Sequence, residues 1–194
     1  DLNLEYGSSH FELFANGFYN RINNYIFISP NGNTIASNAV YDYVQANAAL
    51  YGGEAGIHFH PHPLDWLHFE SSFETVTGKQ DNDSFLPLIP ANSLSNILRA
   101  EFDSKSMTKG YAFIKLRSTF SQNNISSFET TTEGYNLLSA GFGGTIQLLK
   151  KDLNISISGN NLTDQEYINH LSRLKTDNIF NMGRNISLGF IYNL

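Results

Sequence analysis

The chain has 194 residues, of which 41% are hydrophobic, 13% aromatic and 15% charged, a composition typical of folded protein. Its formal net charge of −6 argues against a general nucleic-acid binder, because such a protein needs a basic surface to neutralise phosphates. The absence of cysteine excludes disulfides and thiolate chemistry. No apolar run approaches the roughly 18 residues that a transmembrane helix requires.

Apolar residues recur at every second position along most of the chain, which predicts an all-β protein. In the tail, for example, Leu188 and Phe190 fall on one face and Ser187 on the other. We expect about nine antiparallel strands, many of them longer than the roughly 9–11 residues needed to cross a bilayer. In chain order they cover residues 1–7, 10–28, 40–59, 65–78, 92–104, 109–122, 133–149, 152–160 and 182–194.

The links between these strands alternate in length. GSS, HPHPLD, SKSMTKG and KKD are short, whereas SPNGNTIASNAV, GKQDNDSFLPLIPA, QNNISSFETTTE and the stretch after residue 160 are long. Short turns at one end and long loops at the other are typical of an outer-membrane β-barrel. Aromatic residues near both ends suggest two interfacial belts. They are Tyr43 and Tyr135 at the long-loop end, and Trp66, Tyr111 and Tyr192 at the short-turn end.

The closing segment, NNLTDQEYINHLSRLKTDNIFNMGRNISLGFIYNL at residues 160–194, resembles the C-terminal end of TonB-dependent outer-membrane receptors. In that family an N-L-x-D-x-x-Y element precedes a last loop, and the chain ends on G-R-N-x-x-L-G-x-x-Y-x-Φ, where Φ is an apolar residue. Four upstream segments are similar to the family in the same order. They are FYNRINNYIF at 18–27, YVQANAALYGGEAGI at 43–57, LPLIPANSL at 86–94 and GYNLLSAGF at 134–142.

The resemblance implies that residues 1–194 are the C-terminal portion of an up-and-down transmembrane β-barrel of about 22 strands, without its plug domain and earlier strands. It implies an active-transport receptor in the outer membrane of a Gram-negative bacterium. The ligand would be a siderophore, haem, zinc or another metal complex, or another scarce nutrient. The TonB complex would supply energy through the missing N-terminal part. Outer-membrane lipid and the barrel-assembly machinery are further expected partners, and nucleic acid is not.

No catalytic or cofactor motif is recognisable, so neither an enzyme nor a cofactor is expected. The NHLSRLK stretch at 169–175 resembles family members linked to uptake of zinc or other metals.

The last eight residues resemble the signal that the barrel-assembly machinery reads. Ser187, Gly189, Tyr192 and Leu194 occupy its polar, glycine, aromatic and terminal apolar positions, although Leu194 stands where the commonest form has phenylalanine. A last strand with a central glycine can be accepted edge to edge by another sheet. The alternative is an ordinary edge strand.

Charged side chains of the expected strands are predicted to share the polar, lumen-facing side of the barrel. The candidates for ligand contact are Glu54, His58, His68, Glu70, Glu74, Arg99, Lys115 and Arg117. The imidazoles and carboxylates among them could hold a cation, but the preferred interpretation is a hydrated acidic wall. His170 in the last loop is a further ligand candidate, but a solvated loop histidine is the preferred interpretation.

Three histidines fall at alternate positions in HFHPHP, residues 58–63. The two prolines interrupt strand pairing, so HPHPLD is predicted to be a short periplasmic turn. Because a turn offers no supporting shell for converging ligands, His60 and His62 are interpreted as turn residues without metal affinity. We therefore expect no metal site.

Two other classes of protein would show the same alternation of apolar and polar residues. A soluble β-sandwich binding module, for example for carbohydrate, would bury the apolar face in a core. A small complete outer-membrane barrel with a structural or adhesive role would need an even number of strands and a closed ring of pairings.

Overall fold

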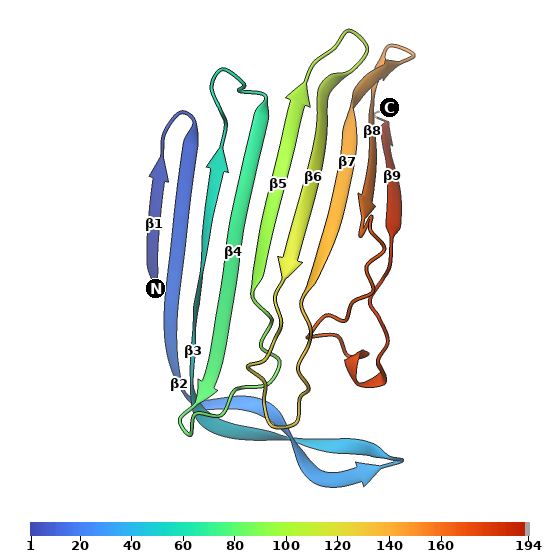
Figure 1. The fold of residues 1–194 in the computed structure, drawn as a ribbon. Coiled ribbons are helices and arrows are strands. Elements are labelled where there is room, and N and C mark those ends of the chain that lie inside the picture. The colour runs from blue at the N-terminus through green and yellow to red at the C-terminus, as the bar shows by residue number, and fades with distance from the viewer. Residues whose placement is uncertain (193–194) are drawn as a thin grey trace.

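The computed structural model describes residues 1–192, which form one antiparallel sheet in which every strand pairs with the next along the chain (Figure 1). The strands are β1 (Leu2–Gly7), β2 (Phe11–Ile35), β3 (Asn38–Phe59), β4 (Leu67–Gln80), β5 (Ser93–Phe102), β6 (Thr108–Thr119), β7 (Tyr135–Leu148), β8 (Lys151–Asn160) and β9 (Asn185–Tyr192). A single 3-10 turn, η1 (Lys175–Asp177), lies in the last loop. The all-β, up-and-down prediction with nine strands is confirmed, and β1 and β9 are the sheet edges. Within residues 1–192, no helix has the length and apolar character to cross a membrane.

The connections segregate by length, as predicted. Residues 8–10, 60–66, 103–107 and 149–150 form short turns at one end of the sheet, drawn at the top of Figure 1. Residues 81–92, 120–134 and 161–184 form long irregular loops at the other end.

The first expected long loop, residues 29–40, is largely strand instead. β2 runs on to Ile35 and pairs with Asn38, so that only Ala36 and Ser37 form the turn, with φ values of 49° and 68°. Positive φ at both central residues belongs to the turn type whose twist matches paired strands. The Pro30 and Gly32 signals that predicted a loop mark an irregularity in register between Pro30 and Thr34. This hairpin tip bends beneath the other long-loop ends (Figure 1), where Tyr41 packs on Phe128 with ring centroids 5.7 Å apart.

The register sorts the strand residues onto two faces. Glu12, His58 and Glu70 form one cross-strand row, and Leu13, Ile57 and Ser71 form the next on the opposite side. We call the first side the polar face; it carries Glu12, Glu54, His58, His68, Glu70, Glu74, Arg99, Lys115, Arg117, Ser158 and Ser187. We call the second side the apolar face; it carries Leu13, Phe73, Leu98, Ile114, Phe142, Ile157 and Leu188.

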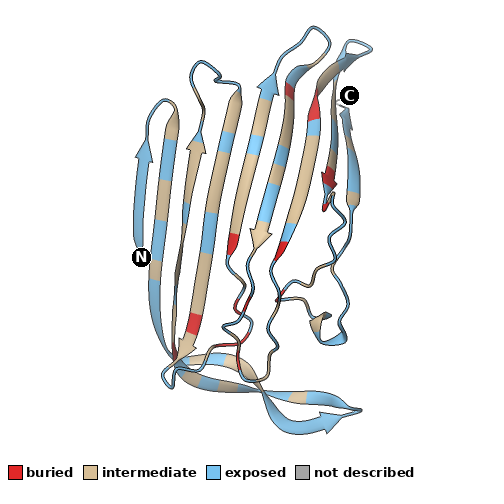
Figure 2. Cartoon of the chain, in the orientation of Figure 1, coloured by how far each residue is buried: buried red, intermediate tan, exposed pale blue. Residues whose placement is uncertain are grey.

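The apolar face is uncovered in the described chain. Leu98, Ile114 and Leu188 are 47%, 55% and 65% exposed. Burial is confined to short bands, several of them near the long loops (Figure 2). The hydrophobic core consists of Ala48, Leu86 and Ile89, where loop 81–92 folds against the end of the β2–β4 region. A sheet whose large apolar surface stays uncovered lacks the core of a soluble sandwich.

Two aromatic residues expected in the interfacial belts lie on the polar face instead. Tyr111 pairs with Glu101 and Gly143, and its ring lies 4.6 Å from the Arg99 guanidinium. Tyr135 is 9% exposed, with its ring centroid 4.4 Å from that of Tyr167. Tyr111 and Lys115 are four residues apart in one strand, so alternation alone places both on the same face.

Candidate functional site

The three long loops meet around the carboxylate of Glu129. Its Oε1 accepts a hydrogen bond from the Leu88 amide at 2.9 Å, and its Oε2 accepts from the Ser126 amide at 3.1 Å and the Ser126 hydroxyl at 2.7 Å. The side chain is only 11% exposed. A carboxylate that accepts several hydrogen bonds from different segments fixes those segments relative to one another.

His170 brings the third loop to this carboxylate. Its Nε2 lies 3.7 Å from Glu129 Oε1, and its Nδ1 lies 2.8 Å from Thr132 Oγ1 and 3.1 Å from Lys175 Nζ. The side chain is 2% exposed, so the expectation of a solvated loop histidine is wrong. Lys175 also donates to the Thr130 carbonyl. We call Glu129, His170, Lys175 and their partners Leu88, Ser126, Thr130 and Thr132 the loop junction.

The surroundings in the loop junction change the pKa values of Glu129, His170 and Lys175. Burial raises the pKa of Glu129, but hydrogen bonds from Leu88 and Ser126, together with His170, bring it below its ordinary value. Burial and the neighbouring Lys175 lower the pKa of His170, against the opposing effect of Glu129. Burial also lowers the pKa of Lys175, and Glu129 opposes that shift. At neutral pH the junction therefore holds an ionised carboxylate and a neutral imidazole.

A pocket of about 280 Å³ opens beside the loop junction. Residues 130–135 and 165–168 form its walls, with Lys175, Asn178 and Phe180 from the last loop. It combines hydroxyl, amide, cationic and aromatic groups, which suits a polar ligand larger than a bare ion.

The N-L-x-D-x-x-Y element builds the base of this last loop. The Asn161 side chain accepts from the Gln165 amide at 2.8 Å and donates to the Gln165 carbonyl at 2.9 Å. Asp164 Oδ1 accepts from the Arg184 amide at 2.8 Å, which joins the two ends of the loop. Sequence reasoning found this element but assigned it no role, and it missed Glu129, for which no local signal exists.

Three of the predicted ligand candidates on the polar face, Glu74, Arg99 and Arg117, are hydrogen-bonded to neighbouring side chains. Arg117 Nη2 donates to Ser93 Oγ at 3.1 Å, and Ser93 Oγ donates to Glu74 Oε2 at 3.2 Å. Arg99 Nε donates to Glu101 Oε1 at 2.9 Å. These contacts place opposite charges beside one another on this part of the face.

Two pockets hollow the polar face. Lys115 and Arg117 line one of about 310 Å³ below the last loop. Glu54, His58 and Glu70 line another of about 330 Å³ nearer the short turns.

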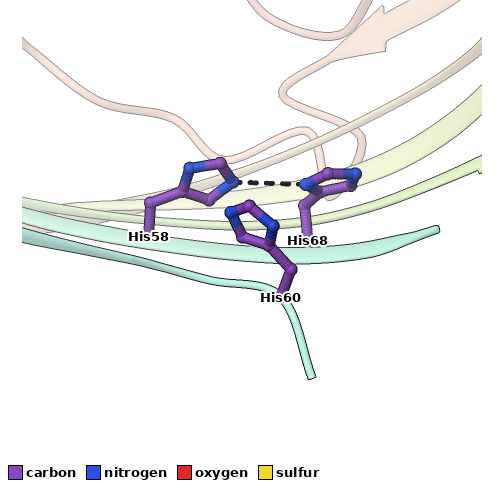
Figure 3. A group of neighbouring side chains, drawn as sticks. All are labelled: His58, His60 and His68. Atoms are coloured by element: carbon purple, nitrogen blue, oxygen red, sulfur yellow. Dashed lines mark hydrogen bonds between the residues drawn. The ribbon is translucent and has the colours of Figure 1, made fainter. Parts of the chain in front are cut away.

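Three histidines converge at the short-turn end (Figure 3). His58 Nε2 lies 3.2 Å from His68 Nδ1, and His60 from the adjoining turn packs against both rings at centroid distances of 4.4 and 5.1 Å. One nitrogen from each residue lies within 4.8 Å of the others, a spacing that one metal ion could bridge. His60 is a turn residue, as predicted, but it lies beside the strand histidines His58 and His68. His62 lies in a second group, with His10 and Asp65.

Comparison with known proteins agrees with this architecture. Residues 1–162 match the family model described as TonB dependent receptor-like, beta-barrel, so the match ends before the G-R-N motif. The structure resembles a copper transporter, OprC, with a TM-score of 0.78 and 19% identity, covering 95% of this chain and 29% of that one. It also resembles the FrpB iron transporter from Neisseria meningitidis, F3-3 variant, with a TM-score of 0.69 and 16% identity, covering 96% of this chain and 29% of that one. The chain spans less than a third of either transporter. No curated protein matches it.

Proposed function

Because the chain belongs to the TonB-dependent receptor β-barrel family, we propose that it forms the C-terminal part of the barrel of an outer-membrane transporter. The transporter imports a scarce ligand, a small metal complex being the favoured class, with energy from the TonB complex. The plug domain and the earlier strands belong to the remainder of the protein. The location is the outer membrane of a Gram-negative bacterium.

The observation that carries this proposal is the uncovered apolar face opposite a charged one. An outward apolar band and a polar interior are typical of a membrane barrel, because charged side chains that face lipid are costly. In this orientation the short turns are periplasmic and the loop junction is extracellular. Strands β1 and β9 then pair with the barrel strands supplied by the rest of the protein.

The two alternatives fit less well. A soluble sandwich would bury residues such as Leu188, which is 65% exposed. A small complete barrel needs an even number of strands in bacterial single-chain examples, and the described residues form nine.

Ligand recognition is assigned to the pocket beside the loop junction and to the polar face beneath it. Lys175 lines that pocket and is anchored by Thr130 and His170, so its ammonium group has a fixed position from which to attract an anionic metal complex. The two transporters with similar folds are named for copper and iron, which supports a metal as the cargo element.

Metal accumulation in whole cells tests the proposal. Cells that lack the full-length protein are compared with complemented cells under iron, copper or zinc limitation, with and without a proton uncoupler. We expect complementation to restore accumulation of one of the metals only while the membrane is energised. Unchanged accumulation of all three would contradict the proposal.

A matched pair of variants tests the site. Lys175→Gln removes the anchored cation, whereas Arg173→Gln removes an exposed one from the same loop. At equal surface abundance, uptake should fall with Lys175→Gln and stay normal with Arg173→Gln. Equal uptake by both variants would show that the pocket is not part of the ligand-recognition site.

A further inference from the structure

We propose that His58, His60 and His68 form a binding site for a divalent transition-metal ion of the zinc type, at the short-turn end of the polar face. The site goes beyond the proposed function, because it lies at the opposite end of the strands from the loop junction and does not depend on what is transported. It joins the end of β3, the turn at residues 60–66 and the start of β4.

The spacing of the ligand atoms suits one ion. Two nitrogen ligands about 2.0–2.1 Å from a tetrahedral Zn²⁺ lie about 3.3 Å apart. His58 Nε2 and His68 Nδ1 are 3.2 Å apart, and the His60 nitrogen lies within 4.8 Å of both. Figure 3 shows the His60 ring beside the line that joins the other two. Closing the remaining gap requires only a small movement of the turn residue.

Neighbouring carboxylates favour the ligating tautomers. Glu12 Oε2 lies 3.5 Å from His58 Nδ1, and Glu101 Oε2 lies 4.0 Å from His68 Nε2. With an ion bound, each carboxylate would attract the proton of the ring nitrogen that points away from the cluster, and the two nitrogens that face each other would be free to ligate. Without an ion, the 3.2 Å contact is a hydrogen bond in which one of the two facing nitrogens carries the proton, and an ion would replace that proton.

His60 supplies an independent observation. Its Nε2 is buried and has no hydrogen-bond partner among the residues that the structure describes. A buried polar atom without a partner calls for an explanation, and a bound ion is one. Imidazole nitrogens select zinc, copper, nickel or iron over magnesium or calcium, which prefer oxygen.

This inference reverses the sequence-based prediction that HPHPLD has no metal affinity. That prediction treated the turn by itself, whereas the supporting carboxylates come from β2 and β5. The second group, His10, His62 and Asp65, is a weaker candidate because the side chains of His62 and Asp65 are 65% and 66% exposed.

Calorimetric titration of the full-length protein in detergent, after removal of bound metal with a chelator, tests the site with Zn²⁺. His60→Asn and His68→Gln each remove one proposed ligand, and His62→Asn is the matched control from the same turn. We expect each ligand substitution to weaken one zinc-binding step by about 100-fold or more, since loss of an outer-shell partner alone costs about 10–100-fold. His62→Asn should bind as the wild type does, and excess Mg²⁺ should not compete.

Chemical labelling of the unaltered protein keeps the test decisive if a variant does not fold. Diethyl pyrocarbonate modifies accessible imidazoles, and mass spectrometry locates the label. Zn²⁺ should protect His58, His60 and His68 and leave His62 reactive. The assignment is overturned if His60→Asn binds zinc normally, if only His62→Asn loses binding, or if Zn²⁺ gives no protection at the three histidines.

Discussion

His170 Nε2 lies 3.7 Å from Glu129 Oε1, and through this contact the last long loop is held against a carboxylate that also binds the amide of Leu88. Three loops that share no local sequence pattern thereby act as one unit. In the proposed receptor this unit positions the wall of the ligand pocket.

Glu129→Gln should loosen the loop junction. The amide keeps the size of the side chain but has no charge and only one acceptor oxygen. The buried donors of Leu88 and Ser126 therefore compete for that oxygen. A cost of about 1–3 kcal/mol in local stability is expected for an unsatisfied buried donor. Hydrogen exchange should accelerate in residues 81–92 and 120–134. Glu133→Gln, an exposed change in the same loop, is the control and should leave exchange unaltered.

Acid should weaken the loop junction in two steps. The pKa of His170 lies below its ordinary value of 6.5 and that of Glu129 below 4.5, so the unfolded loops bind more protons than the folded ones. Stability is therefore lost as pH falls below about 6.5 and again below about 4.5. Hydrogen exchange, corrected for its intrinsic pH dependence, should show opening at pH 5 relative to pH 7.5. His170→Gln should abolish that first step, and an unchanged pH response in this variant would contradict the assignment.

Asp164→Ala should free the two ends of the last loop. Asp164 accepts from the Arg184 amide at 2.8 Å and lies 3.6 Å from the guanidinium group, but it is partly exposed. A loss of about 0.5–1.5 kcal/mol is expected for such a hydrogen bond. Its φ of 55° is tolerated better by Asn than by Ala, and Asn keeps an acceptor. The Arg184 amide should exchange faster in Asp164→Ala, and Asp164→Asn should stay close to the wild type.

Substitutions at neighbouring positions in β9 should have unequal costs. Leu188 pairs with Ile157 on the apolar face, and Ser187 pairs with Ser158 on the polar face. If the apolar face contacts lipid, Leu188→Arg should cost about 2–4 kcal/mol near the bilayer midplane and Ser187→Arg far less. Refolding of the full-length protein into lipid at graded urea concentrations measures both. Equal costs would contradict the orientation of the sheet.

Deletion of residues 192–194 should prevent assembly without weakening ligand binding. Tyr192 lies on the apolar side of the edge strand β9, whereas Leu194 lies outside the described residues. A side chain at Gly189 would meet only the Ser156 hydroxyl within 3 Å, and rotation of that hydroxyl would relieve the contact. Surface abundance and ligand affinity, measured separately on intact cells, test the assembly-signal prediction. Normal surface abundance of the truncated receptor would mean that the tail is an ordinary edge strand and not an assembly signal.

The sequence by itself determined the number of strands, their two faces, the short turns and three of the four long loops. Alternation in a strand has a period of two residues, so neighbouring positions are enough to predict it. Leu188 and Ser187 face opposite sides of the sheet irrespective of the rest of the chain. The same locality explains the error at residues 29–40, where Pro30 and Gly32 signalled a loop but produced an irregularity within a hairpin.

Only the tertiary structure decided which loop residues meet. Glu129 and Leu88 are 41 residues apart, and His170 and Thr132 are 38 apart, so no short-range pattern could connect them. The surroundings of His60 depend on the same kind of contact: Glu12 from β2 and Glu101 from β5 reach the histidine cluster only after the strands have paired in register. Local periodicity determines which side of the sheet a residue faces. Functional sites depend on contacts between distant segments, and strand register and loop packing bring those segments together.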